Sequence, residues 1–176
     1  FTKAGDYIWS SAIPQSQEQP LLADIAYNQL GMRKLGVFHL NTDWGTTAKN
    51  LFVEAFEALG GEIVAVEGYL PEEKDFRATI TRVMSSEPDG IMLESYYADG
   101  ALVTRQLREA GIELPILGVG SIYSPDFLDL AGDAAEGVYT TAYFAPNLPR
   151  AEVQDFIRTF EEKYGHAPNS FNAMAF

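Results

Sequence analysis

Short apolar runs alternate with amphipathic helical patterns along most of this chain, and that alternation limits the folds available to it. The expected strands are residues 35–40, 62–70, 90–96, 115–119 and 138–144. Between the first two, apolar residues recur with helical spacing from Ala48 to Leu59 and stop at Gly60-Gly61. Strands that alternate with helices form a parallel sheet with right-handed crossovers. We therefore predict an α/β fold, a three-layer α/β/α sandwich with a central parallel sheet of the flavodoxin-like kind.

Local residue chemistry also predicts where two helices begin. We expect the first helix to include Pro20 in its opening turn, after a polar stretch from Gln15 to Gln19. A later helix is expected to begin within residues 71–75, where the acidic side chains favour the helix dipole.

The segment LGVFHLNTDWGTT, residues 35–47, predicts a buried strand that runs through a polar turn directly into a helix. Trp44 stands in that turn, where packing of the sheet does not require a large aromatic ring. Ligands of open parallel sheets bind at the carboxyl ends of the strands. Trp44 is therefore the first residue that we expect to contact a ligand.

Charge and composition exclude several classes of function. The net charge of −13 disfavours binding to nucleic acid or to an anionic membrane surface. The chain has no cysteine, and no apolar stretch approaches the roughly 20 residues of a membrane span. It shows no signal peptide, starts without methionine and stops inside a helical pattern, so we expect it to be a piece of a longer protein.

No pattern in the sequence commits the chain to catalysis. His39 lies inside the first strand, where a hydrogen-bonded structural histidine is expected, and His166 follows a helix end. Gly118-Val119-Gly120 lacks the third glycine of a dinucleotide-binding loop. We predict no enzyme, no metal site and no cofactor, although a flavodoxin-like or Rossmann-like enzyme stays open on fold alone.

Aromatic and hydroxyl side chains gather in the loops that follow the strands, which suggests a small-molecule site. The aromatic residues are Trp44, Tyr96, Tyr97, Tyr123 and Tyr143, and the hydroxyl residues are Thr46, Ser95 and Ser121. The alternative is that some of these rings only cover the ends of the sheet.

The order of these segments resembles the type I periplasmic solute-binding proteins of the branched-chain amino-acid (Leu/Ile/Val) ABC-transporter family. The resemblance is carried by LGVFHLNTDWGTTAKNLFVEAFEALGGEIVAVEGY, by EPDGIMLESYYADGALVTRQLREAGIELPILGVG, and by AGDAAEGVY with FEEKYGHAPN. It implies two α/β lobes joined by a hinge of three crossovers, which close on a ligand.

On that resemblance the chain is mainly the second lobe. Residues 1–14 would be the end of lobe one and the first crossover, residues 15–144 the second lobe, and residues 145–176 a return to lobe one. The last helix would then lack its partners, so we expect its face of Val153, Phe156, Ile157 and Phe160 to be exposed or buried in a neighbouring chain, which allows self-association.

The resemblance also assigns the site. Trp44 and Tyr96 match aromatic residues that contact the ligand, whereas Gly120 falls where amino-acid binders of the family carry an acid that pairs with the ligand's ammonium group. Asp43 or Glu94 could replace that acid if it points into the cleft. The expected ligand-binding residues are Asp43, Trp44, Ser95, Tyr96, Gly120, Ser121 and Tyr143.

The resemblance implies an extracytoplasmic or periplasmic solute-binding component of an ABC importer. Its partners would be a small solute, either an amino acid or a related carboxylate or aromatic acid, and a membrane permease. A ligand-sensing domain of a receptor or regulator with the same fold is the alternative among binding proteins.

Overall fold

The computed structural model describes residues 5–7 and 12–175 and separates into two compact units. The sheet unit is Pro14–Thr141, and the terminal unit combines Phe1–Ile13 with Ala142–Phe176. Much of the segment 1–14, expected to end lobe one, therefore lies outside the described residues.

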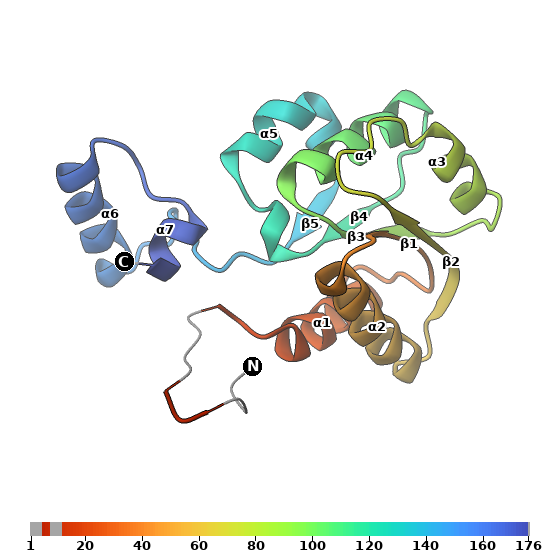
Figure 1. The fold of residues 1–176 in the computed structure, drawn as a ribbon, viewed down its shortest axis with the longest axis horizontal. Helices are drawn as coiled ribbons and strands as arrows, with labels where there is room; N and C mark the ends of the chain where they lie inside the picture. The colour runs from red at the N-terminus through yellow and green to blue at the C-terminus, as the bar shows by residue number, and fades with distance from the viewer. Residues whose placement is uncertain (1–4, 8–11, 176) are drawn as a thin grey trace. The chain divides into compact units, whose positions relative to one another are not determined.

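The sheet unit contains five parallel strands (Figure 1). They are β1 (Lys34–Leu40), β2 (Glu62–Tyr69), β3 (Gly90–Glu94), β4 (Ile116–Gly118) and β5 (Val138–Thr140), in the order β2-β1-β3-β4-β5. The two central strands β1 and β3 are buried along nearly their whole length, which explains their continuous apolar sequence.

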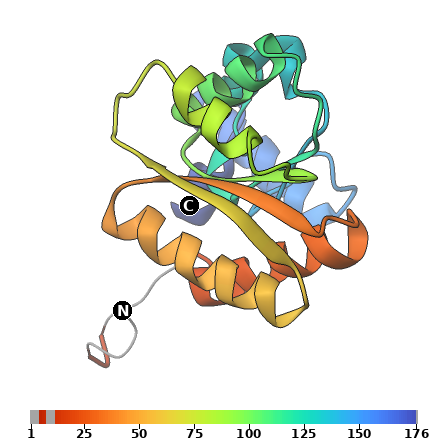
Figure 2. The same cartoon turned by 90° about the vertical axis from the view of Figure 1, so that its right-hand side faces the viewer.

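Helices cover both faces of this sheet (Figures 1 and 2). One face carries α1 (Gln15–Asp24), the π-helical turn η1 (Ile25–Gln29) and α2 (Asp43–Ala58); the other carries α3 (Arg77–Met84), α4 (Tyr97–Glu109) and α5 (Pro125–Ala131). The short turns η2 (Gly120–Ile122) and η3 (Gly132–Ala135) flank α5. The predicted three-layer α/β fold is confirmed.

Alternate residues of the central strands supply the two cores. Leu35, Val37 and Met92 pack with Leu22 of α1 and Phe52 of α2. Phe38, Leu40, Ile91 and Leu93 pack with Ile80 of α3 and Val103 of α4. The period-2 alternation of a strand thus divides β1 and β3 between the two helical layers.

The turn from β1 into α2 is built as its sequence predicts. The Thr42 hydroxyl accepts a hydrogen bond from Gly45 N at 3.2 Å and so caps the helix. A Cβ on Gly45 would lie 2.2 Å from Leu40 O. Only glycine lets the first turn of α2 come this close to the end of the strand.

Two helices begin elsewhere than predicted. The first, α1, begins at Gln15, because Glu18 and Gln19 are buried and extend the stripe of Leu22 and Ala23 by one turn. Because residues 15–19 are polar, their helical conformation was not predicted from the sequence.

In contrast, α3 begins late, at Arg77. The Gln106 side chain accepts a hydrogen bond from Phe76 N at 2.7 Å and donates one to Lys74 O at 2.8 Å. These bonds to α4 hold residues 74–76 outside the helix.

The terminal unit contains α6 (Ala151–Tyr164) and α7 (Ser170–Ala175). The expectation that the whole apolar face of α6 is exposed is wrong for Phe160, which is 5% exposed. Its ring lies within 6 Å of the rings of Phe156, Tyr164 and His166, so the unit forms a small aromatic cluster of its own. None of the described helices combines the length and the apolar character needed to cross a bilayer.

Candidate functional site

The candidate site lies at the edge of the sheet where β1, β3 and β4 end. Parallel strands bring their carboxyl ends to one edge, so residues 41–46, 95–99 and 119–124 meet there (Figure 1). Three of the loops that were expected to carry ligand contacts are therefore neighbours; the loop of Tyr143 belongs to the terminal unit.

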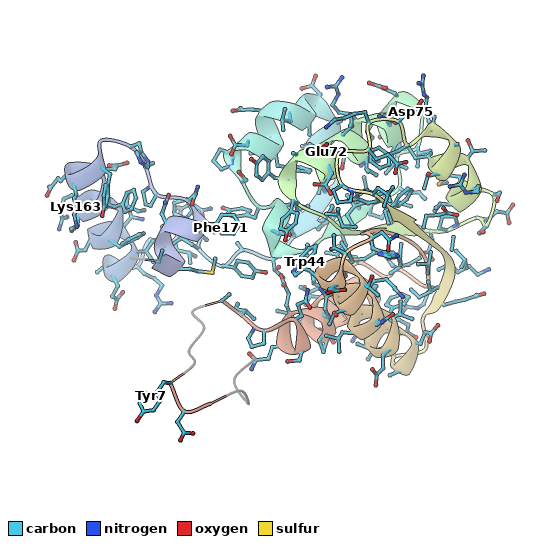
Figure 3. All side chains as sticks on the ribbon, viewed as in Figure 1. Tyr7, Trp44, Glu72, Asp75, Lys163 and Phe171 are labelled. Carbon is cyan, nitrogen blue, oxygen red and sulfur yellow. The ribbon has the colours of Figure 1, made fainter. Side chains whose placement is uncertain are left out.

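An aromatic pair is the most prominent feature of this edge. The rings of Trp44 and Tyr96 stack with their centroids 4.8 Å apart and their planes 16° apart. Trp44 stands in the first turn of α2 (Figure 3), and Tyr96 is the N-cap residue of α4 and is 45% exposed. The Gln15 side chain donates to Trp44 O at 3.2 Å and ties this turn to α1. Trp44 is half-buried and packs against both cores, so its ring does help to pack the sheet, and Tyr96 is the more exposed member of the pair.

A tyrosine–aspartate pair supports the start of α4 beside the stacked aromatic pair. The hydroxyl of Tyr69, at the end of β2, donates a hydrogen bond to the Asp99 carboxylate in the first turn of α4. Burial raises the pKa of Asp99, and the Tyr69 hydrogen bond opposes that effect. Burial and the adjacent Asp99 charge raise the pKa of Tyr69, so its hydroxyl stays protonated and acts as the donor.

The two serines expected in the site are buried. Ser95 is fully buried, and the Ser121 hydroxyl, 8% exposed, donates to Ser95 O at 2.7 Å. This bond joins the loop after β4 to the loop after β3. A direct role of either serine in ligand binding stays a prediction.

Glu18 is the site residue that sequence reasoning missed. Its Oε1 accepts hydrogen bonds from Gly120 N at 2.9 Å and from Thr141 Oγ1 at 2.8 Å, and it is 5% exposed. A carboxylate therefore lies against Gly120, although residue 120 itself carries no side chain. The signal was available in the helical spacing of Glu18 with Leu22, which places both on the buried face of α1.

The two acids proposed as substitutes at this edge differ in their surroundings. Asp43 is exposed at the start of α2. Glu94 is fully buried at the end of β3 and accepts a hydrogen bond from Gln19 Nε2 at 3.1 Å. Burial, followed by the nearby Glu18 charge, raises the pKa of Glu94 well above its usual range.

The remaining predicted tyrosines are placed differently. Tyr97 begins α4 and is 36% exposed, and Tyr123 is half-buried after η2. Tyr143 belongs to the terminal unit. Its role as a ligand contact stays a prediction.

His39 is a structural residue of the sheet. His39 is 8% exposed, and its Nδ1 lies 3.1 Å from Leu40 O, as predicted for a structural histidine. Over residues 5–7 and 12–175, no group of three or more His, Cys, Asp or Glu side chains is placed to hold a metal ion. A surface hollow beside Arg105, Arg108 and Asp133 contains none of the predicted site residues.

Comparison with known proteins defines the class of this fold and site. The family model described as "Periplasmic binding protein" matches residues 2–176. The chain therefore belongs to the periplasmic binding protein family, and its fold is that of one lobe of a type I member. This is a family of non-enzymatic binding proteins, which sets aside the flavodoxin-like or Rossmann-like enzyme.

Several proteins that the chain resembles are named as amino-acid binders or were solved with an amino acid or an aromatic acid. The chain is 27% identical over 148 residues to the Leu/Ile/Val-binding protein homolog 3 of Brucella melitensis, covering 84% of this chain and 40% of the relative. The LivJ branched-chain amino acid substrate-binding protein of Streptococcus pneumoniae, solved with isoleucine, matches with a TM-score of 0.89 and 25% identity over 99% of this chain and 50% of its own.

A third match is a solute-binding protein of an ABC transporter from Rhodopseudomonas palustris, solved with 3,4-dihydroxybenzoic acid. It has a TM-score of 0.82 and 25% identity, over 98% of this chain and 48% of its own. The chain thus spans about half the length of these relatives.

Proposed function

We propose that residues 15–144 of this chain form the second lobe of the extracytoplasmic solute-binding component of an ABC importer. Residues 1–14 and 145–176 would then belong to lobe one and the first crossover. The stacked pair of Trp44 and Tyr96 carries the proposal, because it places two aromatic rings, with Tyr96 45% exposed, where the parallel strands end. The solute is captured between two lobes, and their closure presents a surface to a membrane permease. The protein acts in the periplasm or outside the cytoplasmic membrane.

The proposed solute is an amino acid or a related small aromatic acid. Relatives that were solved with isoleucine and with 3,4-dihydroxybenzoic acid support both classes. The Trp44–Tyr96 pair suits an aromatic or branched apolar group. The Glu18 carboxylate beside Gly120 favours a solute with an ammonium group, since it supplies a negative charge where the resemblance expects an acid.

A ligand panel on the full-length protein tests this proposal. Branched-chain amino acids, aromatic acids, dicarboxylates and small amides are added, and the thermal unfolding midpoint is measured. A solute at 100 times its Kd stabilises the folded protein by about 2.7 kcal/mol and raises the midpoint. The proposal fails if no small acid or amino acid raises the midpoint and Trp44→Ala behaves like the unchanged protein with each of them.

A further inference from the structure

A buried acid and a buried amide connect α1 to the end of β3. Gln19 and Glu94 are both fully buried, and Gln19 Nε2 donates a hydrogen bond to Glu94 Oε2 at 3.1 Å. Glu94 is the last residue of β3 and immediately precedes Ser95 and Tyr96. The pair therefore fixes the strand end that leads into Tyr96 of the stacked aromatic pair.

Each member of this pair retains one buried oxygen without a hydrogen-bond partner. These atoms are Gln19 Oε1 and Glu94 Oε1. If Glu94 were ionised, both atoms could only accept hydrogen bonds, and neither could satisfy the other. Buried polar atoms are nearly always paired, so a missing hydrogen-bond donor has to be accounted for.

Within the part of the chain that the structure describes, no cation acts on Glu94. Glu18, on α1, is itself an acid, and its charge acts on Glu94. On β1, His39 pairs in register with Glu94 of β3. The His39 ring, however, extends toward β2, the neighbour of β1 on the side away from β3: its Nε2 would lie 3.0 Å from a Cβ added at Gly68.

The helix α2 and the strand β4 also pack against β3. The buried residues of α2 include Ala48 and Phe52, and Val119 follows β4. Among the described residues, no lysine or arginine contributes to the electrostatic environment of Glu94.

We propose that Glu94 is held as the neutral carboxylic acid, and that its O–H donates to Gln19 Oε1 to close an acid–amide ring between β3 and α1. One proton then satisfies both unpaired oxygens. The raised pKa of Glu94, caused by burial and by the Glu18 charge, agrees with this assignment. Glu94 acts as a positioning residue: it holds the segment that carries Tyr96 and does not itself contact the solute.

The ring makes the folding stability of the protein decrease as the pH rises. An acid whose pKa is raised by folding contributes stability that is fully present below its unfolded-state pKa. That contribution is lost as the pH rises through the folded-state pKa. The Glu94→Gln variant carries a permanent N–H donor in place of the acid proton, so its stability should lack this pH dependence.

Two measurements on the full-length protein test the proposal. Infrared spectroscopy at about pH 7 should show the carbonyl band of a protonated carboxylic acid that Glu94→Gln abolishes. The thermal midpoint of Glu94→Gln should equal or exceed that of the unchanged protein, by a margin that grows from about pH 6 to about pH 9. Absence of this band in the unchanged protein overturns the proposal even if a variant folds poorly.

The controls separate this ring from other roles of the same residues. Gln19→Met removes the ring partner at similar volume and should lower the midpoint, whereas Glu54→Gln, on the exposed side of α2, should alter neither readout. Absence of the protonated band overturns the proposal. So does a Glu94→Gln variant that stays folded but loses solute binding, since Glu94 would then be a charged ligand contact. Neither readout depends on which solute the protein binds.

Discussion

The Glu18 carboxylate accepts a hydrogen bond from the backbone N–H of Gly120 at 2.9 Å, across 102 residues of sequence. Its second partner, the Thr141 hydroxyl, belongs to the last residue of the sheet unit. One side chain of α1 therefore connects the loop after β4 with the point where the chain leaves the sheet unit. The resemblance also places a ligand contact in this loop, at Gly120.

Removing this connection should destabilise the fold. Glu18→Ala leaves Gly120 N and the Thr141 hydroxyl without their buried acceptor, at an expected cost of about 2–3 kcal/mol in the free energy of unfolding. Glu18→Gln retains an acceptor oxygen and should recover most of that loss. Urea titration of the three proteins measures both values. Equal losses in the two variants would mean that the charge, and not the hydrogen bonding, is what stabilises the fold.

The stacked aromatic pair should dominate solute binding. Trp44→Ala removes the larger ring of the pair, and we expect binding to weaken about 30-fold, equivalent to about 2 kcal/mol. Trp44→Phe preserves an aromatic face and should lose less. Isothermal titration with the best solute from the panel gives these affinities.

The matched control is Leu59→Ala, an exposed apolar residue just beyond the opposite end of α2. We expect it to bind solute as the unchanged protein does. If Trp44→Ala also binds normally, the aromatic pair only covers the end of the sheet.

Gly45 should tolerate no side chain. The Cβ of Gly45→Ala would lie 2.2 Å from Leu40 O, so either the helix start or the strand end has to move, at about 2–3 kcal/mol. Chemical denaturation should show this loss, together with weaker solute binding because Trp44 is the adjacent residue. Thr47→Ala, exposed on the same turn of the helix, should be close to neutral.

Asp99 should make stability depend on pH. Its raised pKa means that the folded protein retains the proton at a higher pH than the unfolded chain does. Stability is therefore lost as the pH rises through the folded-state pKa. Asp99→Asn still accepts the Tyr69 hydrogen bond but does not titrate, so its stability relative to the unchanged protein should rise between about pH 3 and about pH 8. A relative fall over that interval would show that the charged form is the one stabilised.

Much of the fold follows from local sequence patterns. The apolar runs of β1 and β3 and the helical repeat of α2 depend on period and burial, which a sequence displays directly. The turn residues Thr42 and Gly45 also predicted that Trp44 stands at the start of a helix, because helix capping depends on residues close in sequence. By contrast, the late start of α3 depends on hydrogen bonds from Gln106, some 30 residues away, and could not be anticipated.

For the site, the sequence by itself determined which loops meet, because parallel strands deliver their carboxyl ends to one edge whatever their side chains. It also supplied the aromatic residues of those loops, including Trp44 and Tyr96. Only the tertiary structure decided the surroundings of the three acids. Glu18 accepts a hydrogen bond from Gly120 N, Glu94 is buried against Gln19, and Asp43 is exposed. The physical reason is that the environment of a carboxylate is set by long-range neighbours, which no local pattern encodes.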